Sequence, residues 1–152
     1  MGAGAIMRVS AERKVLAVIR DFVKNHAIAA GASAEEAVDL IQAVDEAATN
    51  IIIHGYQERE GEIEIEIRSH PQTVKVILRD NAPTFDPTKV PQPDINLPLE
   101  KRPIGGLGVH LIRHCVDEFS HCAPENGGDE LVLVKQIKSD KNDLIHQMKE
   151  GP

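Results

Sequence analysis

The sequence predicts an α/β two-layer sandwich, in which helices pack on one face of a mixed, mostly antiparallel sheet. Two long segments near the start of the chain repeat apolar residues at helical spacing, and residues 62–68, EIEIEIR, alternate strictly between polar and apolar. In such a strand the isoleucines face a core and the glutamates face water, so the sheet is covered on one side only. Helices on the covered side complete a sandwich of two layers.

The two helical segments have recognisable ends. Residues 11–30 form the first helix, and Gly31 ends it, because glycine readily takes the left-handed conformation that closes helices. Ser33 and Glu36 have the spacing of a capping box, which predicts that the second helix begins there and continues to Gly55.

The remaining elements follow the same reading of periodicity. Residues 73–80 alternate as an antiparallel partner for residues 62–68, and residues 131–137 read as the last strand. Another strand includes residues 117–122, and a third helix covers residues 109–116.

Length and composition indicate one globular domain over residues 1–152, with residues 1–10 and 140–152 as flexible termini. The chain has 152 residues, of which 41% are apolar, so it is long enough to bury a core. Its net charge of -7 argues against nucleic acid or an anionic membrane as the main partner. The absence of a membrane-length apolar run and the presence of only two cysteines favour a cytoplasmic protein.

The second helix carries a polar stripe, and the sequence of the helix alone does not decide whether this stripe is functional. This stripe lies nearly opposite the most apolar face of the helix and consists of Gln42, Glu46 and Asn50. Glu46 and Asn50 are one turn apart. A solvated helix face is the ordinary interpretation, and a functional pair is the alternative. Asp45 is rotated from Glu46 by about 100° around the helix, so we expect it to be solvated or to contact the residues of the stripe without contacting a ligand.

Residues 80–108 depart from the regular pattern. This segment is rich in proline and ends in a glycine cluster just before the third helix. So long a loop in a small domain is usually functional or disordered. The glycines let backbone amides approach a ligand closely, and the N-terminus of the following helix suits phosphate, although neither the P-loop nor the dinucleotide pattern is present.

Three segments in this order carry a family resemblance. VDEAATNIIIHGY (44–56), RDNAPTFDP (79–87) and PLEKRPIGGLGVHLIRHCVDEF (98–119) resemble the signature segments of the bacterial anti-sigma factor serine-protein kinases. These belong to the Bergerat-fold, or GHKL, ATPase superfamily, whose histidine kinase-like ATPase domain is itself a two-layer sandwich. The resemblance extends over nearly the whole chain, as far as LVLVKQI.

The resemblance implies a role for particular residues. Asn50 would ligate Mg²⁺, Glu46 would be the general base, and Asp80 would accept a hydrogen bond from the adenine amino group of ATP or ADP. Residues 86–104 would form a lid over the nucleotide. The other expected nucleotide contacts are Ala82, Phe85, Lys101, Arg102, Gly105, Gly106, Leu107, Gly108 and Val109.

The function implied is that of an ATP-dependent serine-protein kinase. Its substrate would be an anti-sigma-factor antagonist protein, a sigma factor would be a second partner that it holds inactive, and a homodimer is expected because dimers are frequent among similar proteins. One alternative is a regulatory module that binds nucleotide and a partner protein without phosphoryl transfer. Another is a kinase-like domain that elsewhere is fused to a phosphatase or receiver, and which the short length disfavours.

Two local features need separate interpretations. Ala82 stands where the family usually has glycine, and an added methyl is expected to crowd the backbone beside the base or to strain a positive φ. The pairs His114-Cys115 and His121-Cys122 invite a zinc site. Adjacent residues point in different directions, so buried structural cysteines are the preferred interpretation.

Overall fold

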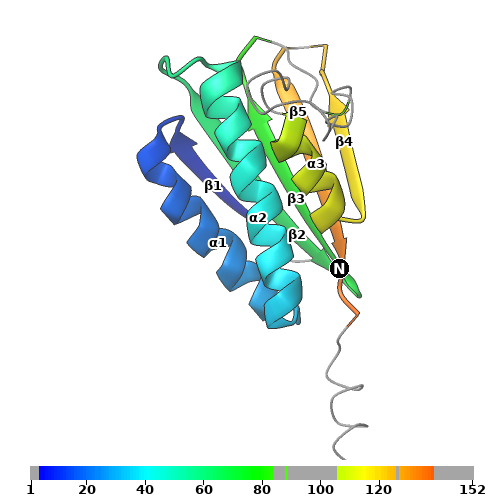
Figure 1. The fold of residues 1–152 in the computed structure, drawn as a ribbon. Helices are drawn as coiled ribbons and strands as arrows, with labels where there is room; N and C mark the ends of the chain where they lie inside the picture. Colours follow the sequence, from blue (N-terminus) through cyan, green and yellow to red (C-terminus); the bar gives the residue numbers. More distant parts are fainter. Residues whose placement is uncertain (1–3, 84–87, 89–105, 126, 139–152) are drawn as a thin grey trace, which may run out of the picture.

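The computed structural model describes residues 4–83, 88, 106–125 and 127–138 (Figure 1). In chain order the elements are β1 (Gly4–Ser10), η1 (Arg13–Val15), α1 (Leu16–Ala29), α2 (Ala34–Asn50), η2 (Ile51–Gly55), β2 (Glu62–His70), β3 (Thr73–Asp80), α3 (Gly106–Cys115), β4 (Glu118–Cys122) and β5 (Asp129–Gln136). The short elements η1 and η2 are a 3₁₀ turn and a π-helical turn.

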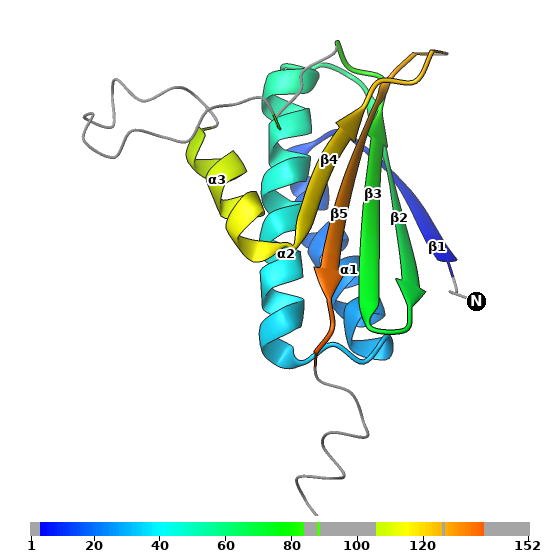
Figure 2. The same ribbon diagram turned by 90° about the vertical axis from the view of Figure 1, so that its right-hand side faces the viewer.

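The strands form one sheet in the order β1-β2-β3-β5-β4. Each neighbouring pair of described strands is antiparallel. Among the described strands the sheet is therefore antiparallel throughout and contains no parallel pair. Seen from the side, α1, α2 and α3 lie on one face of the sheet, and α3 lies on the side of β4 and β5 (Figure 2). The expected two-layer sandwich is therefore confirmed.

The strand β1 corrects one expectation. Residues 4–10 were expected to belong to a flexible terminus, but they pair with β2 from Gly4↔Arg68 to Ser10↔Glu62. Every second residue of β1 is half-buried, and these residues are Ala5, Met7 and Val9. The small side chains near its start weaken the alternation that identifies a strand, which is why periodicity alone missed it. Residues 140–152 lie outside the described residues.

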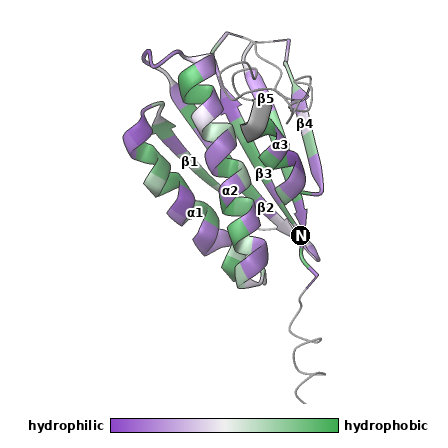
Figure 3. Ribbon diagram, in the orientation of Figure 1, coloured by the Kyte–Doolittle hydropathy of each residue, from purple (hydrophilic) through white to green (hydrophobic). Residues whose placement is uncertain are grey.

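The core lies between the helices and the covered face of the sheet. Figure 3 shows that α1 and α2 carry both hydrophobic and hydrophilic residues around their axes, as amphipathic helices do. The largest fully buried side chains come from both layers: Ile19, Leu40, Ile52, Ile63, Ile65, Leu78, Ile112 and Leu133. No helix in the described part of the chain has the length and apolar character needed to cross a membrane.

Local hydrogen bonds fix where α2 begins and ends. The Glu36 N–H donates to Ser33 Oγ at 3.0 Å and the Ser33 N–H donates to Glu36 Oε1 at 2.8 Å, which confirms the predicted capping box. After Asn50 the helix widens into the π-helical turn, where the Tyr56 N–H donates to the Ile51 carbonyl at 2.8 Å. Single π-helical turns occur frequently at functional sites, which makes the end of α2 a candidate for one.

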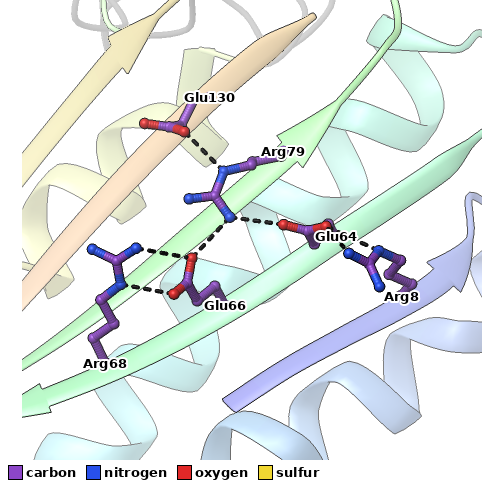
Figure 4. A network of polar contacts seen from close by, with 6 residues as sticks. All are labelled: Arg8, Glu64, Glu66, Arg68, Arg79 and Glu130. Atoms are coloured by element: carbon purple, nitrogen blue, oxygen red, sulfur yellow. Dashed lines mark hydrogen bonds and ion pairs between the residues drawn. The ribbon is translucent and has the colours of Figure 1, made fainter. Parts of the chain in front are cut away.

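The open face of the sheet carries a network of charges rather than separate solvated side chains. Its members are Arg8, Glu64, Glu66, Arg68, Arg79 and Glu130 (Figure 4). Arg79 Nη1 lies 2.7 Å from Glu64 Oε1 and 2.9 Å from Glu66 Oε1, and its Nε donates to Glu130 at 2.8 Å. Glu66 is only 8% exposed, so the expectation that the glutamates of this strand face water is wrong for it. The hydrogen bond from Arg68, followed by that from Arg79, outweighs burial and lowers the pKa of Glu66.

Candidate functional site

The end of α2 and the end of β3 meet at a small cavity. The cavity has a volume of about 20 Å³ and is lined by Asn50, Ile51, Gly55, Asp80, Pro83, Asp129 and Leu131. This volume has room for one water molecule or one small polar group. The structure thus brings together Asn50 and Asp80, two residues that lie 30 positions apart in the sequence.

The side chain of Asn50 is buried without the hydrogen bonds that an amide normally makes. Asn50 is 7% exposed, and its Nδ2 has no hydrogen-bond partner among the described residues. Leaving a buried polar atom unsatisfied costs about 1–3 kcal/mol, so such atoms are uncommon unless something else binds there. Nδ2 is a hydrogen-bond donor, so this position suits an acceptor atom of a polar ligand.

Glu46 lies one helical turn before Asn50 on the same side of α2. Partial burial raises the pKa of Glu46, and the charge of Asp45 raises it further. Asp45 itself is not simply solvated, because Arg20 Nη1 lies 2.7 Å from its Oδ1. A carboxylate whose pKa is moved toward neutrality is better suited to accept a proton than an ordinary glutamate.

Asp80 is a buried carboxylate at the end of β3, with an exposure of 7%. Its Oδ1 accepts a hydrogen bond of 2.9 Å from the Ala82 N–H. Burial raises the pKa of Asp80 to about 6, the charge of Asp129 adds to the rise, and the Ala82 hydrogen bond and the His121 charge oppose it. Among the described residues only this oxygen of Asp80 accepts a hydrogen bond, so the other is open to a ligand.

Ala82 was expected to strain the backbone, and the structure shows no positive φ at this residue. Its φ is not among the positive values of the described residues, and its methyl group is buried at 5% exposure. A Cβ placed on Gly55 would lie 3.1 Å from the Ala82 Cβ. The methyl therefore occupies space that the missing side chain of Gly55 leaves at the end of η2, and the expectation of a strained positive φ is wrong.

Asp129 and His121 belong to this site and were not found from the sequence. Asp129 opens β5 as the register partner of Asp80, and it lines the same cavity. His121 Nε2 lies 2.7 Å from Asp129 Oδ1, and the two side chains are 7% and 5% exposed. The two glycines before Asp129 mark a turn in the sequence, but the register that places Asp129 beside Asp80 is known only from the structure.

The other predicted nucleotide contacts are only partly described. Phe85, Lys101, Arg102 and Gly105 lie outside the described residues, as does nearly all of the expected lid at 86–104. The third helix begins at Gly106 rather than at Val109, so Gly106, Leu107 and Gly108 belong to its first turn. Val109 is 1% exposed and part of the interior.

The zinc alternative finds no support among the described residues, where no group of three or more His, Cys, Asp or Glu side chains could hold a metal ion. Cys115 is buried, and its Sγ lies 3.6 Å from Gln42 Oε1. Cys122 is exposed, so the interpretation as buried structural cysteine is right for Cys115 and wrong for Cys122.

The fold and the site together define a class of domain. An antiparallel sheet with helices on one face, a helix ending in a buried amide, and a buried aspartate at a strand end describe a nucleotide-binding domain of the histidine kinase type. The family model of the histidine kinase-like ATPase domain matches residues 9–135.

Similar proteins identify the family within this class of nucleotide-binding domain. The chain is 31% identical over 139 residues to the serine-protein kinase RsbW of Bacillus cereus (strain B4264), covering 89% of this chain and 86% of the relative. It is 30% identical, with the same coverage, to the serine-protein kinase RsbW of Bacillus mycoides (strain KBAB4). The chain therefore belongs to the RsbW family of serine-protein kinases within the histidine kinase-like ATPase domains.

A solved structure agrees at the level of the fold. The crystal structure of the RsbU and RsbW domains of Rv1364c from Mycobacterium tuberculosis superposes with a TM-score of 0.63 at 15% sequence identity. The match covers 89% of this chain and 32% of that chain.

Proposed function

We propose that this protein is an ATP-dependent serine-protein kinase that phosphorylates an anti-sigma-factor antagonist and also holds a sigma factor inactive. The observation that carries the proposal is the buried side chain of Asn50, whose Nδ2 has no partner among the described residues, beside the buried carboxylate of Asp80. The names of the relatives, serine-protein kinase RsbW, support the type of reaction.

Asn50 and Asp80 have distinct roles in this proposal. Asn50 would hold Mg²⁺ through its amide oxygen, with phosphate oxygens and water completing the octahedral shell that this ion prefers. The bound ion would neutralise charge on the transferring phosphoryl group. Asp80, with one oxygen already bonded to Ala82, would accept a hydrogen bond from the adenine amino group through the other.

Glu46 is proposed as the general base. It lies one turn from the magnesium ligand, so a substrate hydroxyl that attacks the phosphoryl group could reach both the ion and the carboxylate. Partial burial and the neighbouring charge of Asp45 raise the pKa of Glu46, which strengthens it as a proton acceptor. In that role it would take the proton from the serine hydroxyl of the partner protein.

The phosphates would be held at the start of α3. Helix N-termini present free N–H groups and a positive dipole end, and α3 begins at Gly106. Gly105 and Gly108 would allow close backbone approach, with Leu107 and Val109 contributing through their backbones. Lys101, Arg102 and Phe85 remain proposed contacts from the lid.

The decisive experiment separates binding from transfer. The wild type, Glu46→Gln and the control Glu35→Gln, an exposed glutamate in the first turn of the same helix, are compared with labelled ATP, Mg²⁺ and a candidate antagonist. Glu46→Gln should bind nucleotide normally but transfer phosphate to serine about 10²- to 10⁴-fold more slowly. Glu35→Gln should match the wild type in both measurements.

Transfer by Glu46→Gln at the wild-type rate would remove Glu46 from the role of base. Nucleotide binding by the wild type without transfer to any candidate antagonist would favour the regulatory module instead. Calorimetry that detects no binding of ATP with Mg²⁺ at millimolar concentration would refute the nucleotide site itself.

A further inference from the structure

Two buried carboxylates, rather than one, lie at the proposed base-binding end of the site. Asp80 and Asp129 are register partners on β3 and β5, and both line the cavity of about 20 Å³. Like charges so close together in a buried place repel each other unless something compensates them. A residue that merely supported the sheet at position 129 would not need a charge there.

Each carboxylate has one oxygen engaged by the protein. Asp80 Oδ1 accepts from the Ala82 N–H at 2.9 Å, and Asp129 Oδ1 lies 2.7 Å from His121 Nε2. Among the described residues, the second oxygen of each forms no hydrogen bond. The site therefore offers two acceptors, one from each strand, at the cavity that their side chains share.

His121 fixes one member of this pair. It lies on β4, the strand next to β5, and its side chain is 7% exposed, so the contact with Asp129 is shielded from water. Hydrogen bonds that involve a charged group are the stronger ones, and shielding strengthens them further. The contact orients the Asp129 carboxylate and gives it a hydrogen-bond partner next to Asp80.

We propose that Asp129, positioned by His121, is a second base-recognition residue, and that it and Asp80 together hold the exocyclic amino group of a 6-aminopurine. The inference rests on the proposed nucleotide-binding function and extends it to the specificity of the site. An amino group has two N–H donors, which matches the two acceptor oxygens. The cavity has room for one group of that size.

The same arrangement rejects a 6-oxopurine. Such a base presents an oxygen acceptor where adenine presents its amino group, so lone pairs would face two carboxylates. A site built to bind a donor discriminates strongly against an analogue that lacks it, because the buried polar groups are left unpaired.

The test is the ratio of affinities for ATP and inosine triphosphate, each with Mg²⁺, measured by calorimetry on the full chain. Asp129→Asn replaces one acceptor oxygen by a donor and should lower the preference for ATP by about tenfold or more. Asp129→Ser is a second variant with the same expectation. The control Ser120→Ala alters an exposed residue of β4 next to His121 and should leave the ratio unchanged.

His121 is tested as a positioning residue by rescue. His121→Phe removes the polar contact with Asp129 and should lower the ATP preference in the same direction. His121→Gln keeps a hydrogen-bond donor and should restore most of it. A ratio of two affinities on one protein does not depend on the fraction that is folded, so a purely structural role would leave it unchanged.

The outcomes distinguish the two proposals. If the wild type binds ATP and both Asp129 variants keep the wild-type ratio, Asp129 does not read the base, while the proposed function stands. An unchanged ratio in His121→Phe would remove His121 from the positioning role. If the wild type binds neither nucleotide, the proposed function fails and the inference fails with it.

Discussion

The buried carboxylate of Asp80 makes a prediction about stability that needs no ligand. Its pKa in the folded protein is about 6, against an ordinary value of 3.8. The native state therefore binds a proton more tightly than the unfolded chain, so unfolding releases a proton between these two values. Stability must fall as pH rises from about 4 to about 6, and the loss persists above that range. A difference of roughly two pKa units corresponds to about 3 kcal/mol.

Asp80→Asn removes this titration while keeping the shape of the side chain. The asparagine oxygen can still accept the hydrogen bond from the Ala82 N–H, which Asp80 Oδ1 accepts at 2.9 Å in the wild type. We expect the variant to be more stable than the wild type by up to about 3 kcal/mol at pH 8, and by close to nothing at pH 4. It should also bind ATP more weakly, since the acceptor for the amino group is lost.

Urea unfolding at pH 4, 6 and 8 measures the difference directly, with the midpoint and the slope recorded for both proteins. Asp21→Asn, an exposed residue of α1, is the matched control and should show no difference that changes across this range. A stability difference between Asp80→Asn and the wild type that is constant from pH 4 to pH 8 would show that Asp80 is not the buried titrating group described here.

Two further predictions concern the neighbours of Asp80. Asn50→Leu removes an amide whose Nδ2 is buried without a partner among the described residues. In urea unfolding, the free energy of unfolding of the ligand-free protein should rise by about 1–3 kcal/mol, and Mg²⁺-dependent nucleotide binding should be lost. A fall in the free energy of unfolding would mean that the amide is already satisfied in the wild type. Gly128→Ala should destabilise more than Gly127→Ala. Both glycines have positive φ, but a Cβ at Gly128 would lie 2.6 Å from the Asp80 carbonyl oxygen, whereas one at Gly127 would meet nothing within 4 Å. Equal unfolding midpoints for the two variants would argue against this contact.

The elements that the sequence predicted well are those that local chemistry determines. The capping box of Ser33 and Glu36 needs only residues three apart, and the alternation of β2 identifies a strand with one buried face. The strand β1 depends instead on its pairing with β2, because its own residues have weak strand character. The burial of Glu66 depends on arginines from β2 and β3 that compensate its charge.

The site shows the same division. The i,i+4 spacing of Glu46 and Asn50 could be read along one helix, and their shared face followed from it. The partnership of Asp80 with Asp129 and His121 depends on the order in which three strands join the sheet, and no short segment contains that information. The fit of Ala82 against Gly55 is likewise a property of the packing between the end of a helix and the end of a strand.

The features that make the site chemically useful are also the ones that weaken the fold locally. An amide nitrogen with no partner in the described part of the chain and a buried carboxylate with a raised pKa both lie at one cavity, and each is unfavourable in the ligand-free protein. A bound nucleotide would supply what both groups lack: an acceptor atom for the Asn50 Nδ2 donor and a donor for the Asp80 carboxylate. The hydrophobic core and the capped helix α2 hold these groups in place beforehand, so the free energy of binding is not used to assemble them. The unsatisfied polar groups thus lie together at the junction of α2 and β3. This arrangement is the one expected of a binding site that is formed before its ligand arrives.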